Sequence, residues 1–435
     1  MQLTMKTFAV REIVLQGDTM LRDGVLSVNE EELRGVLLKD STLVAVSLDV
    51  ARPGESTRII HVLDAVEPRI KVGGPAVCFP GFMGEPLTVG SGVTHRLGGM
   101  AVVALGNNLL LPSGSETGVL EFNEGVIDMS GIGQQYSACS DTVNLCLGLT
   151  AKEGTSPLQY DTAVRLASLR AAVYLARCTT GDVPCDAEEV LETGCVDPSL
   201  PNVAYINQVQ SQGLLCRTFL YGMPMEGYFT PTLVDPNELM DGAIVSANYR
   251  NFMRACTYMQ QNNMVVRTLY DRHGKDLNFV GMIASRGHYD DQPSKTRSGS
   301  FAAKLAGFLK AHACVLTLEG TGNANVDFMA TVKALELAGI AAAPIVHEFG
   351  GPGGEDEPLF DVAPQAVSVI SGGGVERRFA MPAMDKVIGG DSVRFIYGDK
   401  GFISDDPRVS RTATAHFYFC GYWAMQDKGF KAFDF

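Results

Sequence analysis

Long apolar runs, closely paired cysteines and clustered positive charge are all missing from this 435-residue sequence. No apolar run approaches the roughly 20 residues that a helix needs to cross a bilayer, so we expect no membrane span. The first residues, MQLTMKTFAVREIV, alternate apolar and polar side chains and carry Arg11 and Glu12. This pattern excludes the apolar core of a signal peptide. Together these absences predict a cytoplasmic protein.

The charge balance is acidic, with 35 Lys and Arg against 49 Asp and Glu and a formal net charge of -14. The basic residues are scattered along the chain, so they do not form the positive stripe that binding to a phosphate backbone requires. We therefore expect no nucleic-acid partner.

None of the ten cysteines belongs to a C-x-x-C pair. In a cytoplasmic protein such cysteines are reduced thiols rather than a disulfide framework. The tightest group, Cys178, Cys185 and Cys195, has loose spacing and no nearby histidine, which disfavours a structural zinc site. The sequence therefore predicts no metal.

The length suggests two or three packed units, and no internal repeat is present. Residues 1–150 contain strand-like runs separated by turn residues, and Asn29 is the expected N-cap of one short helix at 30–38. Residues 151–240 are predicted to be a connecting region that contains a long helix from 161 to 178 and several strands. These two regions predict a β-rich domain followed by a connection.

Residues 241–435 alternate apolar strands with amphipathic helices, which is typical of a parallel sheet covered on both faces. The sequence thus predicts an α/β fold, α+β overall, with a β-rich N-terminal part and a doubly wound, Rossmann-like C-terminal half. The predicted helices are at 264–274, 300–313 and 325–340, and the predicted strands are at 277–285, 314–320, 341–349 and 365–373.

Ligands of such sheets bind at the carboxyl ends of the strands, which indicates the loops at 285–289, 319–323, 347–356 and 371–374. The EGTGNANVDF stretch could receive an anion at a helix start, although a tight turn with Asn325 as N-cap is the favoured interpretation. HEFGGPGGEDEP could build a metal or cationic-substrate site, although a solvated lid loop is favoured. Gly274 is expected to end a helix in the left-handed conformation.

Cys256 follows the strand-like run DGAIVS and precedes a cluster of amides, in the segment RACTYMQQNN. Arg254 would favour the thiolate if the two side chains meet, and Asn262 and Asn263 offer donors for an oxyanion. Three interpretations stay open at this point. Cys256 is a nucleophile, the precursor of a cofactor, or a small residue of the core.

Eight short motifs, in order over nearly the whole chain, resemble the component B proprotein of the glycine, sarcosine and betaine reductases, to which the pyruvoyl-bearing proprotein of D-proline reductase is related. Chance likeness of eight motifs in register is very improbable. The motifs are ARPGESTRI (51–59), EPRIKV (67–72), GVIDMSG (125–131), QGLLCRTFLYG (212–222), MDGAIVSAN (240–248), QQNN (260–263), LYDRHGKDLNFVG (269–281) and PAMDKVIGG (382–390).

The resemblance implies a chain that cuts itself before an internal cysteine, which becomes an N-terminal pyruvoyl group. That carbonyl condenses with the substrate amine and draws electrons from the carbon-nitrogen bond. A selenocysteine or cysteine on a separate subunit then attacks the carbon and expels the amine. The implied cofactor is thus pyruvoyl, the substrate is a small amine or amino acid, and the protein is expected to form a hetero-oligomer with a component B-type subunit.

This sequence departs from the family pattern at Tyr249, which stands directly after SAN where the cysteine is expected. A phenol lies too far from the backbone to form the five-membered ring of the rearrangement, so Cys256 is the remaining candidate. Asn248 and Tyr249 are expected to shape the adjacent turn, and His273 and Glu319 are candidate proton carriers. The alternative is an uncleaved chain that serves as a cofactorless scaffold or uses Cys256 as an ordinary thiol.

Overall fold

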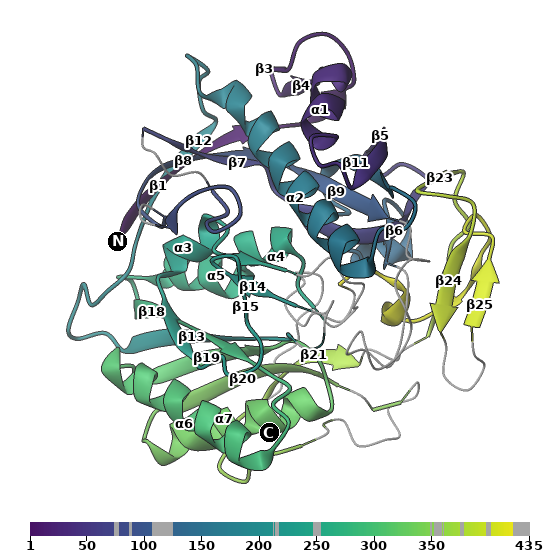
Figure 1. Ribbon diagram of the computed structural model, residues 1–435. Coiled ribbons are helices and arrows are strands. Elements are labelled where there is room, and N and C mark those ends of the chain that lie inside the picture. The colour runs from purple at the N-terminus through teal and green to yellow at the C-terminus, as the bar shows by residue number, and fades with distance from the viewer. Residues whose placement is uncertain are drawn as a thin grey trace.

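The computed structural model has two halves that meet along a seam, as Figure 1 shows. The seam is the layer between the sheets of the N-terminal half and the single large sheet of the C-terminal half, and short helices fill it. They are α3 (Pro236–Met240), α4 (Thr257–Gln261) and α5 (Met264–Arg272). The structure describes residues 1–73, 78–86, 89–106, 125–211, 213, 217–246, 254–348, 350–351, 359, 361–374, 378–396 and 402–420.

Two sheets form the N-terminal half, one in the order β12-β1-β8-β7 and one in the order β10-β6-β9-β11-β5, with β23 added beside β6. Strands β6 and β9 are buried along nearly their whole length because both faces of their sheet are covered. The strands are β1 (Gln2–Ala9), β5 (Leu43–Ala51), β6 (Thr57–Val66), β7 (Arg69–Val72), β8 (Gly92–Gly98), β9 (Met100–Gly106), β10 (Gly125–Asp128), β11 (Val143–Ala151), β12 (Ala187–Glu192) and β23 (Lys386–Ile388).

Helix α2 (Pro157–Ala176) lies across these sheets (Figure 1). Its start is well determined by the sequence, since Ser156 and Gln159 form a reciprocal capping box and Pro157 occupies the first turn. The predicted long helix is confirmed, and it begins four residues earlier than expected. Helix α1 (Glu30–Leu37) is also confirmed, because the Asn29 side chain accepts a hydrogen bond from the Glu32 N–H.

The C-terminal half is built on a six-stranded sheet in the order β16-β18-β13-β19-β20-β21. All its neighbouring strands are parallel except the edge strand β16, which is antiparallel to β18. Central strand β13 is buried at every residue, as expected for a strand covered on both faces. The strands are β13 (Asn202–Val209), β16 (Thr232–Val234), β18 (Asn278–Arg286), β19 (Ala313–Leu318), β20 (Ala341–Glu348) and β21 (Ile370–Gly374).

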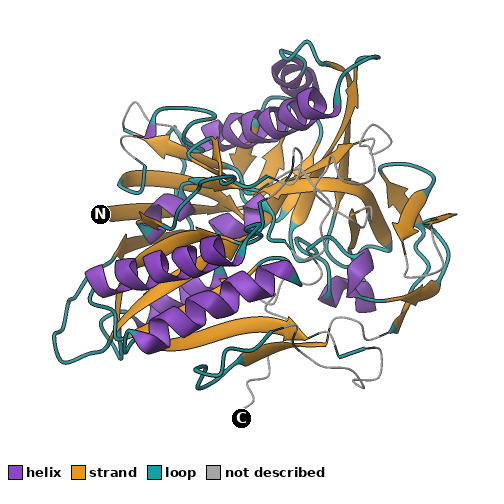
Figure 2. Cartoon of the chain, turned by 60° about the horizontal axis from the view of Figure 1, so that its bottom comes forward, coloured by secondary structure: helices purple, strands orange, loops and turns teal. Residues whose placement is uncertain are grey.

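Helices cover both faces of this sheet. Helices α6 (Gln292–Phe308) and α7 (Asn323–Leu337) lie side by side on the outer face (Figure 2). Helix α5 packs on the inner face, toward the seam. Consecutive residues of β18 point to opposite sides, since Ile283 joins the core beneath α6 and α7 whereas Met282 joins the core around α5. The predicted α/β fold, with strands rich at the N-terminus and a parallel C-terminal sheet, is confirmed.

Two helix starts differ from the prediction. Helix α6 begins at Gln292 rather than near 300, because the Asp291 side chain caps it and Pro293 fits its first turn. Helix α7 begins at Asn323, with Gly322 in the left-handed region at φ 60° as its N-cap. The predicted N-cap at Asn325 is therefore wrong, since Asn325 lies inside the helix.

The middle of the chain contributes to both halves, so the division at residues 150 and 240 stays a prediction. Strand β12 pairs with β1 in the N-terminal half, whereas β13 and β16 belong to the C-terminal sheet. The end of the described chain returns to the N-terminal half, where the Phe419 N–H donates to the Val126 carbonyl at 2.8 Å. Among the described residues, no helix is long and apolar enough to cross a membrane.

The remaining elements are short ribbons and turns at the periphery and along the seam. They are β2 (Glu12–Val14), β3 (Met20–Arg22), β4 (Val25–Ser27), β14 (Phe219–Leu220), β15 (Met223–Pro224), β17 (Ile244–Val245), β22 (Phe379–Met381), β24 (Val393–Ile396), β25 (Phe402–Asp405) and β26 (Arg411–Ala413), with 3-10 turns at Ile132–Gln135, Arg177–Thr179 and Ala415–Phe417.

Candidate active site

The segment around Cys256 lies in the seam. Strand β17 enters the seam, and residues 254–256 lead from there into α4 and α5. Strand β6 of the N-terminal half lies on one side of this segment, and the carboxyl ends of β13 and β19 lie on the other. Asn248 and Tyr249 fall outside the described residues, so their expected role in shaping the turn stays a prediction.

Glu319 follows β19 and anchors the segment from the C-terminal side. It is 1% exposed, and its Oε1 accepts hydrogen bonds from the Ala255 N–H at 3.1 Å and from Gln260 Nε2 at 2.8 Å. Its Oε2 accepts from the Gln210 N–H at 2.9 Å, and Arg254 Nε lies 3.8 Å away. Burial raises the pKa of Glu319 to about 7, although Arg254 opposes the shift. The carboxyl can therefore exchange a proton near neutral pH.

The peptide bond between Ala255 and Cys256 is held at both ends. The Ser246 hydroxyl donates to the Ala255 carbonyl oxygen at 2.7 Å. Beyond Cys256, the Thr257 N–H and hydroxyl donate to the two Asp64 oxygens at 2.9 and 2.6 Å. A donor fixed at a carbonyl oxygen also stabilises negative charge that develops there when the carbonyl is attacked.

Cys256 precedes the first residue of α4 and is 3% exposed. Its side chain packs in one cluster with Cys139 and Cys420, and both thiols form hydrogen bonds with it. Burial opposes ionisation of Cys256. The hydrogen bonds from the two thiols and from backbone N–H groups outweigh burial and lower its pKa well below the ordinary thiol value. Cys256 is thus a buried residue with thiolate character.

Asp64, on β6, is the carboxyl group beside this sulfur. Burial and the negative charge of Cys256 raise the pKa of Asp64 to about 8, while hydrogen bonds from Thr257 and Ala65 act in the opposite direction. The pKa shifts of Asp64 and Cys256 have opposite signs, so a thiolate at Cys256 favours the protonated form of the Asp64 carboxyl. Arg254, expected to favour the thiolate, forms its described contacts with Thr218 and Glu319.

The two amides after α4 fix the corner between α4 and α5. Asn262 Oδ1 accepts from Arg69 at 2.8 Å and from Arg96 at 3.3 Å, and its Nδ2 donates to the Tyr258 carbonyl. Asn263 caps α5 by accepting from the Val266 N–H, and its Nδ2 donates to the Tyr205 hydroxyl at 3.1 Å. These bonds give both residues a structural role. Their predicted support of an oxyanion stays a prediction.

His273 ends α5, which separates it from Cys256 by the length of that helix. Its Nδ1 accepts a hydrogen bond from the Phe279 N–H at 2.9 Å, and burial lowers its pKa. Gly274 follows with φ 71°, as predicted for a helix end. The expected role of His273 as a proton carrier stays a prediction.

The HEFGGPGGEDEP loop, which the sequence singled out, is described only in part. Residues 352–358 of the HEFGGPGGEDEP stretch lie outside the described part of the chain, and His347 at its start is 2% exposed, with burial lowering its pKa to about 4. Within the ranges that the structure describes, no group of three or more His, Cys, Asp or Glu residues could hold a metal ion.

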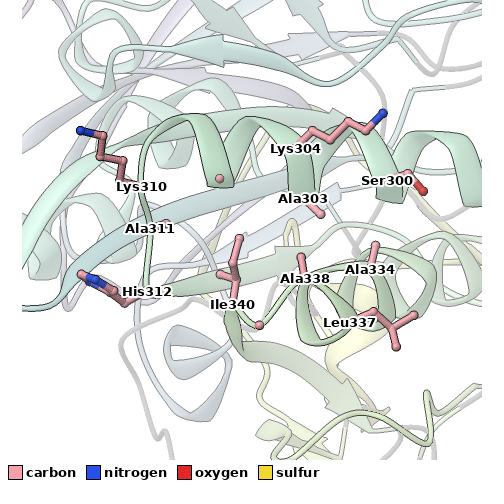
Figure 3. A pocket seen from close by; sticks show the side chains of 12 residues that line it. Ser300, Ala303, Lys304, Lys310, Ala311, His312, Ala334, Leu337, Ala338 and Ile340 are labelled. Carbon is pink, nitrogen blue, oxygen red and sulfur yellow. The ribbon is translucent and has the colours of Figure 1, made fainter.

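An open hollow of about 750 Å³ lies on the outer face, between the ends of α6 and α7. Figure 3 shows Lys304 and Lys310 on its α6 side and Leu337 and Ala338 on its α7 side. Since α6 and α7 lie on the face opposite the seam, this hollow is remote from Cys256.

Comparison with known proteins identifies the family. Residues 1–411 match the glycine/sarcosine/betaine reductase component B subunits. The sarcosine reductase complex component B subunit alpha of Peptoclostridium acidaminophilum is 38% identical over 415 residues, which cover 93% of this chain and 94% of the relative. The glycine reductase complex component B subunits alpha and beta of the same organism are 36% identical over 399 residues, 89% of each chain.

The betaine reductase complex component B subunit alpha of this organism is 33% identical over 401 residues, which cover 89% of this chain and 88% of the relative. No solved structure matches the chain significantly. The chain therefore belongs to the family of glycine/sarcosine/betaine reductase component B subunits, which confirms the resemblance found in the sequence motifs.

Several residues of the site escaped the sequence analysis. Asp64 interrupts the apolar run TRIIHVLDAV, and a lone carboxylate inside a strand buried on both faces is a signal that could have found it. Ser246 ends the run DGAIVS, where the sequence pattern indicates only a strand. Cys139 and Cys420 carry no local signal, since only the fold brings them to Cys256.

Proposed function

We propose that this chain is the substrate-activating subunit of a glycine/sarcosine/betaine-type reductase, which cleaves a carbon-nitrogen bond of a small amine or amino acid. It works with a partner subunit that bears a selenocysteine or cysteine, in a hetero-oligomer in the cytoplasm. The family membership supports this reductase role, since the relatives are named as subunits of reductase complexes. The observation that carries the proposed centre is the Cys256 sulfur, buried in the seam beside a hydrogen-bonded peptide carbonyl.

The same geometry favours self-cleavage between Ala255 and Cys256. The thiolate of Cys256 attacks the carbonyl carbon of Ala255, and the Ser246 hydroxyl stabilises the charge that develops on the carbonyl oxygen. Glu319 holds the Ala255 N–H, so the acyl side of the bond stays in place. In this proposal Asp64 takes the proton of the thiol and returns it to the departing nitrogen, which leaves a thioester between Ala255 and the Cys256 side chain. Elimination at Cys256 then releases the part that ends at Ala255 as a thiocarboxylate. Water hydrolyses the dehydroalanine that remains, which releases ammonia and leaves a carbonyl.

The residues present therefore fit a pyruvoyl group derived from Cys256. This group supplies a carbonyl that withdraws electrons from the carbon-nitrogen bond of a bound amine. The name of the glycine reductase relatives gives two subunits, alpha and beta, to one chain, which also agrees with a chain that is divided after synthesis. The chain's own residues then orient the substrate in the seam and exclude water from it.

A second function is favoured by one observation, the tyrosine at position 249 where the family pattern places a cysteine. In that case the chain stays intact. It serves either as a cofactorless binding and scaffolding subunit or as a thiol-dependent enzyme that uses Cys256 directly on a carbon-nitrogen bond.

Release of amine by the complex reconstituted with its partner subunit separates the functions that need Cys256 from the scaffold. The test variant is Cys256→Ala, and the matched control is Cys314→Ala, which removes an equally buried thiol from β19. We expect Cys314→Ala to retain activity. Cys256→Ala should lower the rate of amine release at least about a hundredfold, because the residues around a reactive covalent group cannot replace it. Full activity of Cys256→Ala would exclude both thiol-based functions and leave the scaffold.

A further inference from the structure

Three thiols from distant parts of the chain meet at the seam. Cys139 follows the 3-10 turn at Ile132–Gln135, Cys256 precedes α4, and Cys420 follows the 3-10 turn at Ala415–Phe417. Cys256 and Cys420 lie in one core cluster and the partly buried Cys139 packs against it, and the thiols of Cys139 and Cys420 both form hydrogen bonds with Cys256. Burial in a core does not by itself require two thiols to converge on the sulfur of a third.

The backbone is strained at both partner cysteines. Cys139 has φ 59° and Cys420 has φ 57°, a left-handed conformation that residues other than glycine rarely adopt and that costs on the order of 1 kcal/mol. Glycine would adopt it without strain, but glycine has no thiol. Strain of this kind persists where the surrounding structure requires it, often at functional sites.

The surrounding hydrogen bonds fix both strained turns. The Cys139 carbonyl accepts from the Thr142 hydroxyl at 2.9 Å and from Asn144 Nδ2 at 2.8 Å. The two segments are also joined to each other, because the Ala138 N–H donates to the Phe419 carbonyl at 3.3 Å. The two thiols are therefore presented to Cys256 as one unit.

Other buried thiols show how burial changes the pKa of a cysteine. Burial alone raises the pKa of Cys314 to about 12, and burial is also the main reason why the pKa of Cys78 and that of Cys146 lie far above the ordinary thiol value. Cys256 is as buried as these residues, and its pKa is shifted in the opposite direction. The difference lies in the two thiol donors and the backbone N–H groups around it.

We propose that Cys139 and Cys420 are positioning residues, whose S–H groups donate to the Cys256 sulfur and hold it as the thiolate aimed at the Ala255 carbonyl. This inference rests on the proposed function only in that Cys256 is the reactive group. In this step the S–H bond of Cys256 breaks and an O–H bond forms on a carboxylate. The proton of Cys256 passes to Asp64, the carboxyl that faces the sulfur from β6.

The test compares Ala and Ser at each position. Cys139→Ser and Cys420→Ser keep a hydrogen-bond donor of similar size, whereas Cys139→Ala and Cys420→Ala remove it; Cys314→Ala is the control. In full-length protein that cleaves, the readout is the rate of cleavage against pH. If the full-length protein stays intact, the readout is the ultraviolet absorbance of the Cys256 thiolate against pH. This absorbance is obtained by subtracting the curve of the Cys256→Ala variant.

We expect each Ala variant to shift the pH midpoint upward by at least about one unit, which slows cleavage or depletes thiolate about tenfold at neutral pH. Each Ser variant should keep a pH midpoint close to that of the wild type. Circular dichroism should show that all variants are folded. A purely structural role predicts the reverse order, since Ala fills an apolar site better than Ser. Unshifted midpoints in folded Ala variants would overturn the proposal. Failure of the wild type to cleave would instead count against pyruvoyl formation alone.

Discussion

The two faces of the C-terminal sheet are built on different physical principles. On the outer face, α6 and α7 cover the strands with a core of mostly alanine, leucine, isoleucine, valine and phenylalanine side chains, and one buried ion pair, Lys295 with Asp327, joins the two helices. On the inner face, next to the seam, apolar residues are joined by buried charges and amides. These are Asn207, Arg254, Gln260, Gln261, Asn263 and Glu319, together with Asp64, Glu67 and Arg69, which the N-terminal half contributes from across the seam.

The difference shows where the chain keeps buried polar groups that contribute little to its stability. Burial of apolar side chains stabilises the outer face directly. Buried ion pairs and carboxyls on the inner face lose their hydration, so they contribute little net stability and are costly to leave unpaired. Groups of this kind with shifted pKa values gather at functional sites. The seam is therefore the part of the molecule where we expect variants to affect both folding and chemistry.

Removing a buried charge from the seam should have the largest effect on stability. Arg69 is fully buried and donates to Glu67 at 2.6 Å, to the Met240 carbonyl and to Asn262. Arg69→Met leaves the Glu67 carboxylate buried without its cation, so we expect a loss of about 3 to 5 kcal/mol in the free energy of unfolding. Chemical denaturation measures it, with Lys304→Met on the exposed outer face as control. A loss under 1 kcal/mol would contradict the contrast between the faces.

Glu319 should make stability depend on pH. Its folded pKa of about 7 lies above the reference value of 4.5, so the folded state holds the proton longer and stability falls as pH rises from about 4.5 to 7. The full change is on the order of 3 kcal/mol. The groups that face this carboxyl are Arg254, Gln260, Tyr205 and the N–H groups of Gln210 and Ala255.

The matched variant is Glu319→Gln, which cannot ionise. We expect it to remove this fall from the curve of unfolding free energy against pH, although it is less stable overall because the amide cannot accept all three hydrogen bonds. Parallel curves for wild type and variant would show that Glu319 is ionised throughout, as an ordinary ion-paired carboxylate.

A substitution in the outer core should change stability alone. Ile283→Val removes one methylene group beneath α6 and α7, and we expect a loss of about 1 kcal/mol. Its neighbour Met282 on the same strand faces the seam, so the two residues lie on opposite faces of the sheet. The pH dependence of stability should match that of the wild type. A changed pH dependence would mean that the two faces are coupled.

The smallest effect is expected at the surface of the outer face. Phe308, at the end of α6, is 85% exposed. Phe308→Gln should change the free energy of unfolding by no more than about 0.5 kcal/mol, because the ring buries little area in the folded chain. Thermal unfolding by circular dichroism measures this, and a loss above 1 kcal/mol would indicate that the ring packs in the folded molecule.

The sequence predicted most of the C-terminal half because its signals are local. Strands such as CVLTLEG and helices such as NVDFMATVKALELAGI have the correct periodicity within one window. The pairing of β23 with β6, and of β12 with β1, joins residues far apart in the chain, and no local pattern specifies it. Helix starts were missed where a cap such as Asp291 lies several residues before the apolar pattern begins.

The candidate site was predicted in part for the same reason. Cys256 could be found because it follows a strand and lies among polar residues, and the family motifs surround it. Asp64, Ser246, Cys139 and Cys420 acquire their importance only through contacts across the seam. The strained φ angles at the two partner cysteines have no counterpart in the sequence.

Intact-mass spectrometry of the purified protein, under conditions where the reconstituted complex is active, tests the reactive seam most directly. We predict two species, one ending at Ala255 and one comprising residues 256–435 with a carbonyl at its N-terminus that reacts with a hydrazide reagent. A single full-length mass, unreactive toward that reagent in an active complex, would contradict cleavage at Cys256.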